Sequence, residues 1–225
     1  MKPLTDKHLS VLRRHMVELI SVHANVLEDE IGKPSLGEKV LAAMQRVPRH
    51  LFVPQAIAAL AYQDSALPIG FDKTISQPFI CALMTDLLDP GHTDMVLEIG
   101  TGLGYQTAIL AELASRVWTV EIVEEFSNQA EELLGELGYS NVVFRVGDGS
   151  RGWIEHGPYD RIMLTAAPER VPPALLDQLK PGGRMVLPVG PVNGQWLMVI
   201  DKDAIGETHA RQVIPVSFSS LEAVI

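Results

Sequence analysis

The second half of the chain, from about residue 95, alternates short apolar runs with amphipathic segments. Such alternation of strand and helix patterns predicts a mostly parallel sheet with helices on both faces. The expected strands are Met95–Ile99, Val117–Val120, Val142–Val146, Arg161–Thr165 and Met185–Pro188. The expected helices between the first and the fourth of these strands are Tyr105–Leu113 and Glu124–Leu137.

The alternation of strand and helix stops after Pro188. Two more strands are expected at Gln195–Ile200 and Ala210–Phe218, joined by a charged turn near Asp203–Gly206. We expect these two strands to form an antiparallel hairpin that extends the sheet. The predicted fold class is therefore α/β, a doubly wound, mostly parallel seven-stranded sheet with a C-terminal antiparallel hairpin.

The N-terminal part of the chain, up to about residue 90, is expected to be helical with irregular links. Thr5 and Asp6 can cap a first helix, whose apolar positions are Leu9, Leu12, Met16, Leu19 and Ile20. Ser35 and Glu38 have the spacing of a capping box for a second helix, which Pro48 ends.

A stretch with Pro and Gly, from Leu67 to Pro78, precedes an apolar helix expected at Phe79–Leu88. The change of pattern divides the chain into a helical segment, 1–90, and an α/β segment, 91–225. We expect the two segments to form one structural unit.

Composition narrows the classes of protein that fit. The chain has 225 residues, 47% of them hydrophobic, and a formal net charge of −10. Nucleic-acid binding needs clustered Lys and Arg, so this charge argues against a nucleic-acid partner. The sequence has no apolar run of about 18 residues, so it predicts no membrane span, and we expect no signal peptide. The single cysteine, Cys81, excludes an intrachain disulfide, and these features together favour the cytoplasm.

The strongest local signal is a glycine-rich turn between a strand and a helix, Glu98-Ile99-Gly100-Thr101-Gly102-Leu103-Gly104. Its spacing is G-x-G-x-G, whereas a pyrophosphate-binding loop has G-x-G-x-x-G. The Glu98 carboxylate suits a ligand that carries cationic groups and no phosphate. The alternatives are a tight turn without a ligand and a nicotinamide-dependent reductase, which the spacing and Glu98 both disfavour.

Two further acidic residues follow the next two strands. Glu121 could accept hydrogen bonds from both hydroxyls of a ribose, or it could be a solvated charge at a strand end. Asp148 could accept from an exocyclic amine such as that of adenine, or it could serve turn chemistry, which Asp and Gly favour. Both lie at carboxyl ends of strands, where open α/β sheets bind ligands.

These motifs resemble those of class I S-adenosylmethionine-dependent methyltransferases. Over roughly residues 38–200 the chain resembles one family among them, the protein-L-isoaspartate O-methyltransferases. The narrower resemblance is carried by Val47-Pro48-Arg49-His50-Leu51-Phe52-Val53, Leu67-Pro68-Ile69-Gly70, Thr74-Ile75-Ser76-Gln77-Pro78, Gly104-Tyr105-Gln106-Thr107, Leu164-Thr165-Ala166-Ala167, Leu179–Arg184 and Leu187–Gly190. The pairing of T-I-S-Q-P with L-P-I-G is far more specific than the glycine loop.

The family methylates the side carboxylate of L-isoaspartyl residues and so starts protein repair. The resemblance implies that segment 1–90 lies on the substrate side and that segment 91–225 binds S-adenosylmethionine. The implied cofactor-binding residues are Glu98, Gly100, Thr101, Gly102, Gly104, Gln106, Thr107, Glu121, Asp148 and Gly149. The implied partners are proteins or peptides with isoaspartyl residues. No metal is expected, because the seven His residues show no ligand spacing.

The resemblance assigns Ser76 to the active site, where its hydroxyl would aim the substrate carboxylate at the methyl group. A carboxylate is already ionised at neutral pH, so the reaction needs alignment and exclusion of water rather than a general base. Ser76 is also expected to be a helix N-cap, since Pro78 follows. The other implied substrate contacts are Thr74, Gln77, Thr165 and Ala166. The alternative for Thr165 and Ala166 is close packing of the strand against the loop. The alternative for Gln106 and Thr107 is that they are ordinary polar residues at the start of a helix.

The chain departs from the family pattern in its substrate half. Phe71-Asp72-Lys73 stands where the family commonly has Gly-Gln, and Ser217 stands in place of a basic residue. The N-terminal helices also look longer, around residues 23–35. Two alternatives therefore stay open: a diverged carboxyl methyltransferase with another acceptor, and a cofactor-binding adaptor without turnover. A monomer is favoured over an oligomer.

Overall fold

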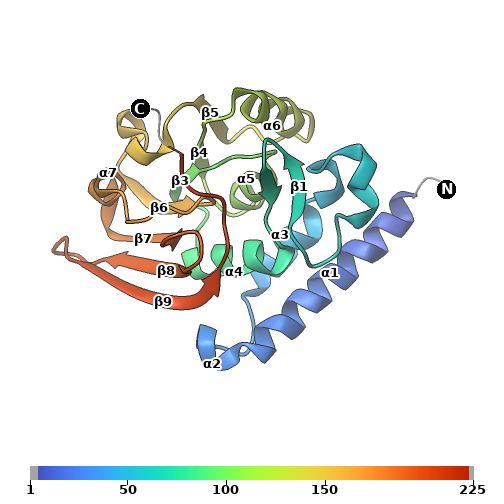
Figure 1. The fold of residues 1–225 in the computed structure, drawn as a ribbon, viewed down its shortest axis with the longest axis horizontal. Coiled ribbons are helices and arrows are strands. Elements are labelled where there is room, and N and C mark those ends of the chain that lie inside the picture. The colour runs from blue at the N-terminus through green and yellow to red at the C-terminus, as the bar shows by residue number, and fades with distance from the viewer. Residues whose placement is uncertain (1–4, 223–225) are drawn as a thin grey trace.

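The structure, a computed structural model, describes residues 5–222 (Figure 1). Its helices are α1 (Asp6–Val26), α2 (Glu28–Ile31), α3 (Glu38–Arg46), α4 (Pro78–Leu88), α5 (Tyr105–Ala111), α6 (Glu124–Glu136) and α7 (Pro173–Asp177). Its strands are β1 (Leu67–Gly70), β2 (Lys73–Ile75), β3 (Met95–Ile99), β4 (Arg116–Glu121), β5 (Val142–Val146), β6 (Tyr159–Leu164), β7 (Leu179–Val189), β8 (Gln195–Lys202) and β9 (Thr208–Val216). Short 3₁₀ helices lie at Arg49–Leu51, Gln55–Leu60, Gly149–Arg151 and Ile154–His156.

Seven strands form one sheet in the order β5-β4-β3-β6-β7-β8-β9. Neighbours from β5 to β7 run parallel, whereas β7–β8 and β8–β9 are antiparallel. The predicted fold class is confirmed, including the antiparallel addition at the end of the chain. β7 begins at Leu179 rather than at the expected Met185. Leu179 pairs with Tyr159 and Arg184 pairs with Arg161, so the turn-like sequence Pro181-Gly182-Gly183 lies in a register irregularity inside the strand and does not end it.

Side chains alternate between the two faces of the sheet and feed two hydrophobic clusters. Along β3, Val96 belongs to one cluster, and Leu97 and Ile99 belong to the other. Helices α1, α3, α4, α5 and α6 contribute to the Val96 cluster, whereas α7 contributes Leu175 to the second. The first face is therefore the thickly covered one (Figure 1).

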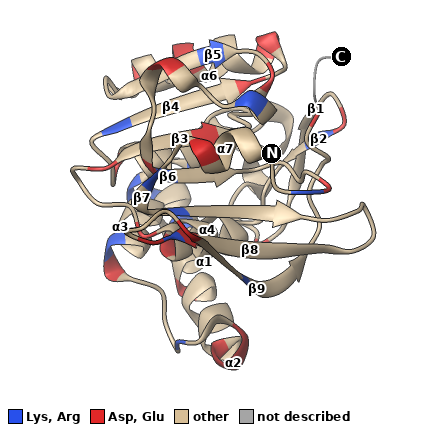
Figure 2. Cartoon of the chain, turned by 90° about the vertical axis from the view of Figure 1, so that its left-hand side faces the viewer, with Lys and Arg blue, Asp and Glu red and all other residues tan. Residues whose placement is uncertain are grey.

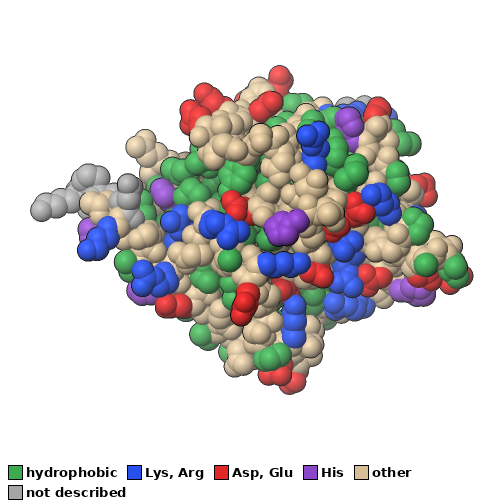
Figure 3. All heavy atoms as spheres, turned by 180° about the vertical axis from the view of Figure 1, so that it is seen from behind, with side chains coloured by type: hydrophobic (Ala, Val, Ile, Leu, Met, Phe, Trp, Pro, Cys, Tyr) green, Lys and Arg blue, Asp and Glu red, His purple; other side chains and the backbone are tan. Residues whose placement is uncertain are grey.

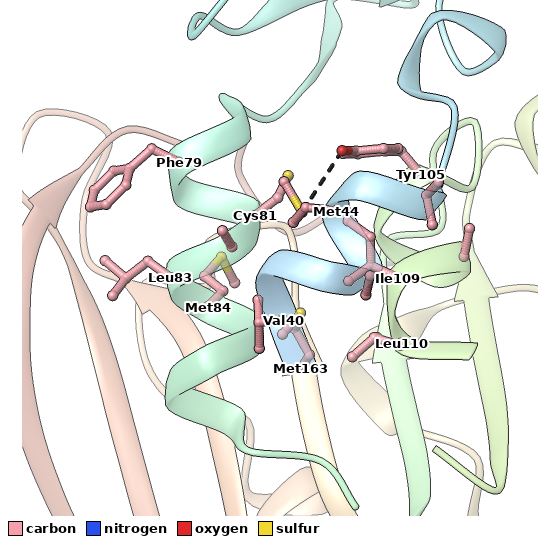
Figure 4. Close-up of a cluster of buried hydrophobic side chains, with 14 of the residues drawn as sticks. Val40, Met44, Phe79, Cys81, Leu83, Met84, Tyr105, Ile109, Leu110 and Met163 are labelled. Atoms are coloured by element: carbon pink, nitrogen blue, oxygen red, sulfur yellow. Dashed lines mark hydrogen bonds between the residues drawn. The ribbon is translucent and has the colours of Figure 1, made fainter. Parts of the chain in front are cut away.

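The core of the thickly covered face joins segments far apart in the sequence (Figure 4). Val40 and Met44 of α3 meet Cys81 and Met84 of α4, and the Tyr105 hydroxyl of α5 lies 3.8 Å from the Met44 sulfur. These side chains are at most 3% exposed. Burying each one contributes about 1.5–3 kcal/mol to folding, so the N-terminal helices are part of the main core.

The first helix begins as the sequence predicts, with Thr5 as N-cap, and His8 completes a capping box that was not foreseen. The expected capping box of Ser35 and Glu38 is wrong, because the N-cap of α3 is Gly37 and has no side-chain cap bond. Instead, the Gly37 N–H donates to Asp86 Oδ1 of α4 at 2.6 Å. A side chain from a distant helix thus replaces the local acceptor.

A two-stranded hairpin, β1–β2, occupies the stretch that was expected to be irregular. Its turn residues Phe71 and Asp72 have φ values of 50° and 55°, the backbone of a tight primed turn that normally selects Asn and Gly. The Phe71 ring packs edge-on against Phe126 of α6, with ring centroids 5.3 Å apart. This tertiary contact accompanies a turn that the local sequence does not signal.

Positively and negatively charged residues are distributed along many elements of the fold (Figure 2). The short helix α2 carries three acidic residues in its first turn, Glu28, Asp29 and Glu30. Among residues 5–222, no helix is both long enough and apolar enough to cross a membrane.

Candidate active site

A cavity lies at the carboxyl ends of β3, β4 and β6, where the glycine loop, residues 100–104, follows β3. Open α/β sheets bind ligands at this edge. Most of the residues expected in the site line the cavity, namely Thr74, Ser76, Gly100, Thr101, Gly102, Gln106, Glu121, Gly149, Thr165 and Ala166. The hairpin β1–β2 and the C-terminal residues 219–222 complete its wall. Within residues 5–222, neither α1 nor α3 reaches this cavity.

The glycine loop needs glycine at position 100. Gly100 has a φ of 97°, and a Cβ there would stand 2.3 Å from Thr165 Oγ1. The Thr165 hydroxyl donates to the Gly100 carbonyl at 2.6 Å, so the end of β6 fixes the loop that follows β3. The bare backbone of the loop is thereby held at the cavity, where a ligand can approach closely.

Glu121, at the end of β4, holds the glycine loop from the other side. Its Oε2 accepts from the Gly102 N–H at 2.8 Å, and its Oε1 accepts from the Ile122 and Val123 N–H groups at 3.0 Å each. A carboxylate offers about four acceptor positions. Three are occupied by backbone N–H groups, so one position remains for a ligand hydroxyl in the cavity wall.

Glu98 lies behind the glycine loop and does not line the cavity, although the sequence predicted that its carboxylate faces a ligand. It is fully buried, and its Oε2 accepts from the hydroxyls of Thr107 at 2.5 Å and Thr119 at 2.7 Å. The Thr119 hydroxyl lies 2.6 Å from that of Thr101 in the loop. Glu98 therefore links β3, β4, α5 and the glycine loop from the inside.

This burial also affects the protonation state of the Glu98 carboxyl group. Desolvation raises the pKa of Glu98 to about 8, although hydrogen bonds from Thr107 and Thr119 oppose the rise. Its Oε1 has no hydrogen-bond partner among residues 5–222. Because Oε2 already accepts two hydroxyl groups, the proton belongs on Oε1 below that pKa.

The N-terminal part of α5 sends one of its expected site residues into the cavity. Gln106 lines the cavity and donates to Thr85 Oγ1 at 2.8 Å. Thr107 is fully buried against Glu98. Gly104 packs between helices, since a Cβ there would stand 2.6 Å from Leu134 Cδ1 of α6. Thr107 and Gly104 thus shape the loop from behind.

The two expected cofactor residues in the turn after β5, Asp148 and Gly149, have different roles in the structure. Asp148 is the N-cap of a 3₁₀ helix, and its Oδ1 accepts from the Ser150 N–H at 2.9 Å. The turn chemistry raised from the sequence is therefore present at Asp148, and its contact with an exocyclic amine stays a prediction. Gly149 lines the cavity, and a Cβ there would stand 2.3 Å from Ile99 Cγ2.

Ser76 lies between β2 and α4 and lines the cavity. Its expected role as a helix N-cap is wrong, because the N-cap residue of α4 is Gln77. Asp64 supplies the acceptors instead: Oδ1 accepts from the Phe79 N–H and Oδ2 from the Gln77 side-chain amide, both at 2.9 Å. The cap of α4 therefore does not require the Ser76 hydroxyl.

Arg49 is a candidate that the sequence analysis did not single out. It is fully buried, its Nη2 donates to the Ser76 carbonyl at 2.7 Å, and its Nε donates to the Ala61 carbonyl at 2.8 Å. Its guanidinium lies 4.7 Å from the centroid of the Tyr105 ring. Arg49 therefore fixes the backbone of Ser76, and its position in V-P-R-H-L-F-V was the available signal.

A groove adjoins the cavity and is the second open space at this edge of the sheet. It is lined by Ala66, Thr74, Ser76, Gln77, Ile80, Thr165, Pro215, Val216, Ser217, Phe218 and Ser219. Four residues line both the groove and the cavity, namely Thr74, Ser76, Thr165 and Ser219. Within the described part of the chain, no charged side chain lines the groove. Gln77, which the resemblance offered as a substrate contact, lines the groove and not the cavity.

The C-terminal segment 217–222 lies against both spaces, a role that the sequence did not predict. The Gln195 side chain holds it through Phe218, accepting from the N–H at 2.6 Å and donating to the carbonyl at 3.0 Å. The Ala167 backbone then pairs with Ser219 and Leu221, at 2.8 Å each. These partners are distant in sequence, so Ser217 stood out only as a departure from the family pattern.

One group of possible metal ligands lies outside the cavity, although the His spacing in the sequence did not suggest it. Asp203, Glu207 and His209, around the turn between β8 and β9, bring ligand atoms within 4.8 Å of one another. Asp203 Oδ1 already accepts from the N–H groups of Ile205 and Glu207. Hydrogen bonds of the turn account for this cluster.

Comparison with known proteins agrees with the geometry. Residues 22–223 match the family model described as Protein-L-isoaspartate(D-aspartate) O-methyltransferase. A protein-L-isoaspartate O-methyltransferase from Polaromonas sp. strain JS666 is 51% identical over 219 residues, which is 97% of this chain and 93% of that protein. One from Syntrophobacter fumaroxidans is 51% identical over 217 residues, covering 96% of this chain and 88% of that protein.

Solved structures agree as well. A protein-L-isoaspartate O-methyltransferase structure matches with a TM-score of 0.80 at 25% identity, covering 94% of this chain and 66% of that chain. A Plasmodium falciparum protein, crystallised in complex with S-adenosyl-L-homocysteine, shares the fold with a TM-score of 0.76 at 20% identity, covering 93% of this chain and 98% of that chain. The family model and the relatives at half identity show that this chain belongs to the protein-L-isoaspartate O-methyltransferase family.

Proposed function

We propose that this chain transfers a methyl group from S-adenosylmethionine to the side carboxylate of L-isoaspartyl residues in damaged proteins or peptides, the step that initiates their repair. The observation that carries the proposal is the junction of cavity and groove. The residues shared by the two spaces bear hydroxyl groups, namely Thr74, Ser76, Thr165 and Ser219. An acceptor in the groove would present its carboxylate to these donors at the edge of the cavity.

The chemistry of the cavity fits S-adenosylmethionine. Apolar side chains suited to a planar base line the wall around Glu121, namely Ile99, Val120, Ile122 and Phe126. Glu121 retains one acceptor position for a ribose hydroxyl, and the Gly100–Gly104 backbone allows close approach. When bound, the cofactor supplies a methyl group that its sulfonium already activates. We propose no metal in this reaction.

The side chains of this protein need only bind and align the acceptor. A free acceptor carboxylate is ionised near pH 7, and the Ser76 hydroxyl can donate to it while the other oxygen faces the methyl group. Arg49 holds the Ser76 carbonyl and so fixes this donor. Alignment of this kind can lower the barrier by several kcal/mol. Burial raises the pKa of Cys81 to about 11, so this thiol in the cavity wall stays neutral and is a poor competing nucleophile.

The groove is suited to acceptors with many different sequences around the isoaspartyl residue. Its lining is uncharged among the described residues and combines hydroxyl groups, an amide and apolar side chains. Such a surface does not select for charge in the residues that flank the isoaspartyl group. This fits damaged proteins as partners, because deamidation occurs in many sequence contexts.

We infer that the protein acts as a cytoplasmic monomer without a nucleic-acid partner. The net charge of −10 supports the absence of a nucleic-acid partner, and Lys and Arg side chains are interspersed with Asp and Glu on the face shown in Figure 3. The single buried cysteine suits a reducing compartment. We also propose that segments 1–90 and 91–225 form one structural unit, since both contribute to the cluster that contains Met16 and Val96.

Methyl transfer from labelled S-adenosylmethionine to one synthetic peptide, offered in isoaspartyl and normal aspartyl forms, tests the function. We expect a base-labile methyl ester on the isoaspartyl form alone. Label on other carboxylates, with the isoaspartyl peptide unmodified, would indicate a diverged carboxyl methyltransferase. Cofactor binding without transfer to any acceptor would indicate an adaptor.

The role of Ser76 is tested in the same assay with Ser76→Ala. Loss of one hydrogen bond to a charged group predicts a decrease in kcat/KM of about 10- to 100-fold, with unchanged affinity for S-adenosylhomocysteine. Ser115→Ala is the matched control, because Ser115 is exposed and immediately precedes β4, outside the cavity and the groove. Equal activity of the two variants would remove Ser76 from the mechanism.

A further inference from the structure

The charged side chains of the cavity wall are few. Among the described residues, they are Lys73, Glu121 and Glu222. Glu121 is engaged by three backbone N–H groups. Lys73 and Glu222 form an ion pair with each other across 149 positions of the sequence. Lys73 is therefore the one cation that the described residues place in this wall.

The place of Lys73 suits contact with an acceptor. It begins β2 and immediately precedes Thr74, which lines both the cavity and the groove. Its side chain is 24% exposed, whereas that of Glu222 is 55% exposed. The Lys73 side chain is thus the more enclosed partner, and its carboxylate partner comes from the C-terminal segment that also lines the cavity.

We propose that Lys73 binds the carboxylate of the acceptor and that Glu222 occupies this position when no acceptor is present. This inference rests on the proposed function, since it requires an anionic acceptor. A carboxylate that leaves water needs a charged or hydrogen-bonding partner, and Lys73 provides a charged one in the wall of the same cavity that Ser76 lines. Lys73 is then a specificity-determining residue that selects acidic acceptors.

Exchange of one carboxylate for another explains why the pair can open. Replacing Glu222 with an acceptor carboxylate leaves the net charge beside the cofactor cavity unchanged. Ion pairs that remain partly in water contribute little to stability, so the Lys73–Glu222 pair presents a small barrier to an incoming carboxylate. Glu222 keeps the ammonium partnered until an acceptor arrives.

A purely structural role for the pair predicts different behaviour. If the Lys73–Glu222 pair only fastens the C-terminal segment to the hairpin, removing either partner has the same effect. If Lys73 binds the acceptor, removing Lys73 weakens acceptor binding, whereas removing the Glu222 charge strengthens it. The sign of the two changes therefore separates the two roles.

The test measures KM and kcat for the isoaspartyl peptide with Lys73→Met, Glu222→Gln and the double variant. We expect Lys73→Met to raise KM about 5- to 10-fold with little change in kcat. Glu222→Gln should lower KM about 2- to 3-fold, and this gain should vanish in the double variant. Rising salt should raise KM of the unmodified protein more than that of Lys73→Met.

Controls separate this inference from the proposed function. Lys39→Met removes another partly exposed ion pair, with Asp89, outside the cavity, and should leave KM unchanged. Affinity for S-adenosylhomocysteine, measured by calorimetry, should be the same in all variants, which shows that the cavity is intact. Changes of KM in the same direction for Lys73→Met and Glu222→Gln would overturn the inference. Absence of transfer by the unmodified protein to the isoaspartyl peptide would instead overturn the proposed function.

Discussion

The two walls of the cavity are held in different ways. The wall made by the glycine loop is fixed by buried groups, with Glu98 inside the sheet and Glu121 on three backbone N–H groups. The opposite wall, made by hairpin β1–β2 and residues 219–222, is joined by the partly exposed pair of Lys73 and Glu222. In the first wall, buried polar groups lock the loop. In the second wall, the hairpin and the C-terminal segment are each anchored in the fold, but a partly exposed ion pair joins them to each other.

This difference matches what each wall has to bind. The cofactor is the same molecule in every turnover, and a rigid, preorganised wall binds it with a small cost in ordering entropy on the side of the protein. An acceptor that is part of another protein varies in its surroundings, and it has to enter and leave. Contacts that open easily are therefore expected on the acceptor wall, where exposed ion pairs contribute little stability.

The largest effect is expected when a methyl group is added to the rigid wall made by the glycine loop. Gly100→Ala would place a Cβ 2.3 Å from Thr165 Oγ1 at a φ of 97°. We expect a loss of about 2–5 kcal/mol in the free energy of unfolding, from strain plus overpacking, together with loss of cofactor binding. Urea unfolding and calorimetry with S-adenosylhomocysteine measure the two effects.

Gly138→Ala is the matched control for Gly100→Ala. Gly138 has a φ of 85°, but no atom lies within 4 Å of its Cβ position. Only backbone strain applies there, so a loss of about 1 kcal/mol is expected, with normal cofactor binding. Similar losses in both variants would show that the loop is not closely packed.

A second, pH-dependent effect is expected from Glu98. Its pKa is about 8 in the folded chain, against an ordinary value of 4.5, so between these values the folded state holds more protons than the unfolded state. Its contribution to stability is fully present below pH 4.5 and is lost as the pH rises toward 8, at up to about 1.4 kcal/mol per pH unit.

Glu98→Gln mimics the protonated side chain and should remove this dependence. In urea unfolding at about pH 5.5 and about pH 7.5, the unmodified protein should lose stability relative to the variant as the pH rises. Parallel pH profiles of the two proteins would show that Glu98 is ionised in the folded state.

The smallest expected effect concerns the turn of the acceptor wall. Asp72 has a φ of 55°, which glycine adopts without strain. Asp72→Gly should stabilise the protein by about 0.5 kcal/mol, because relief of strain exceeds the entropy gained by the unfolded chain. Asp72→Ala should destabilise it, since Asp tolerates this backbone region better than Ala. Shifts of the same sign in thermal unfolding would contradict this view of the turn.

Sequence reasoning succeeded where the signal is local and periodic. The strands and helices expected after residue 95 are present, with β7 beginning earlier than expected, at Leu179, because each apolar run of the sheet is bounded by its own turn signals. The positions of Gly100 and Glu121 in the cavity wall follow from the same logic, since the carboxyl ends of parallel strands share one edge.

It was less successful where a partner comes from far along the chain. Asp86 replaced the expected cap at Ser35, and Asp64 replaced the expected cap at Ser76. The burial of Glu98 depends on threonines from β4 and α5, which no local pattern reveals. The acceptor wall combines residues near 73 with residues near 222, and only the folded chain brings them together.

The buried guanidinium of Arg49 limits how far this enzyme can be assembled from exchangeable parts. It spans the Ala61 and Ser76 carbonyls and the Tyr105 ring, so the serine segment and the helix after the glycine loop share a single internal strut. A chimera that takes residues 47–78 from a relative must therefore take a compatible α5 with them. The sequence pattern changes near residue 90, but Arg49 couples the segments on the two sides of that boundary, so they cannot be exchanged independently.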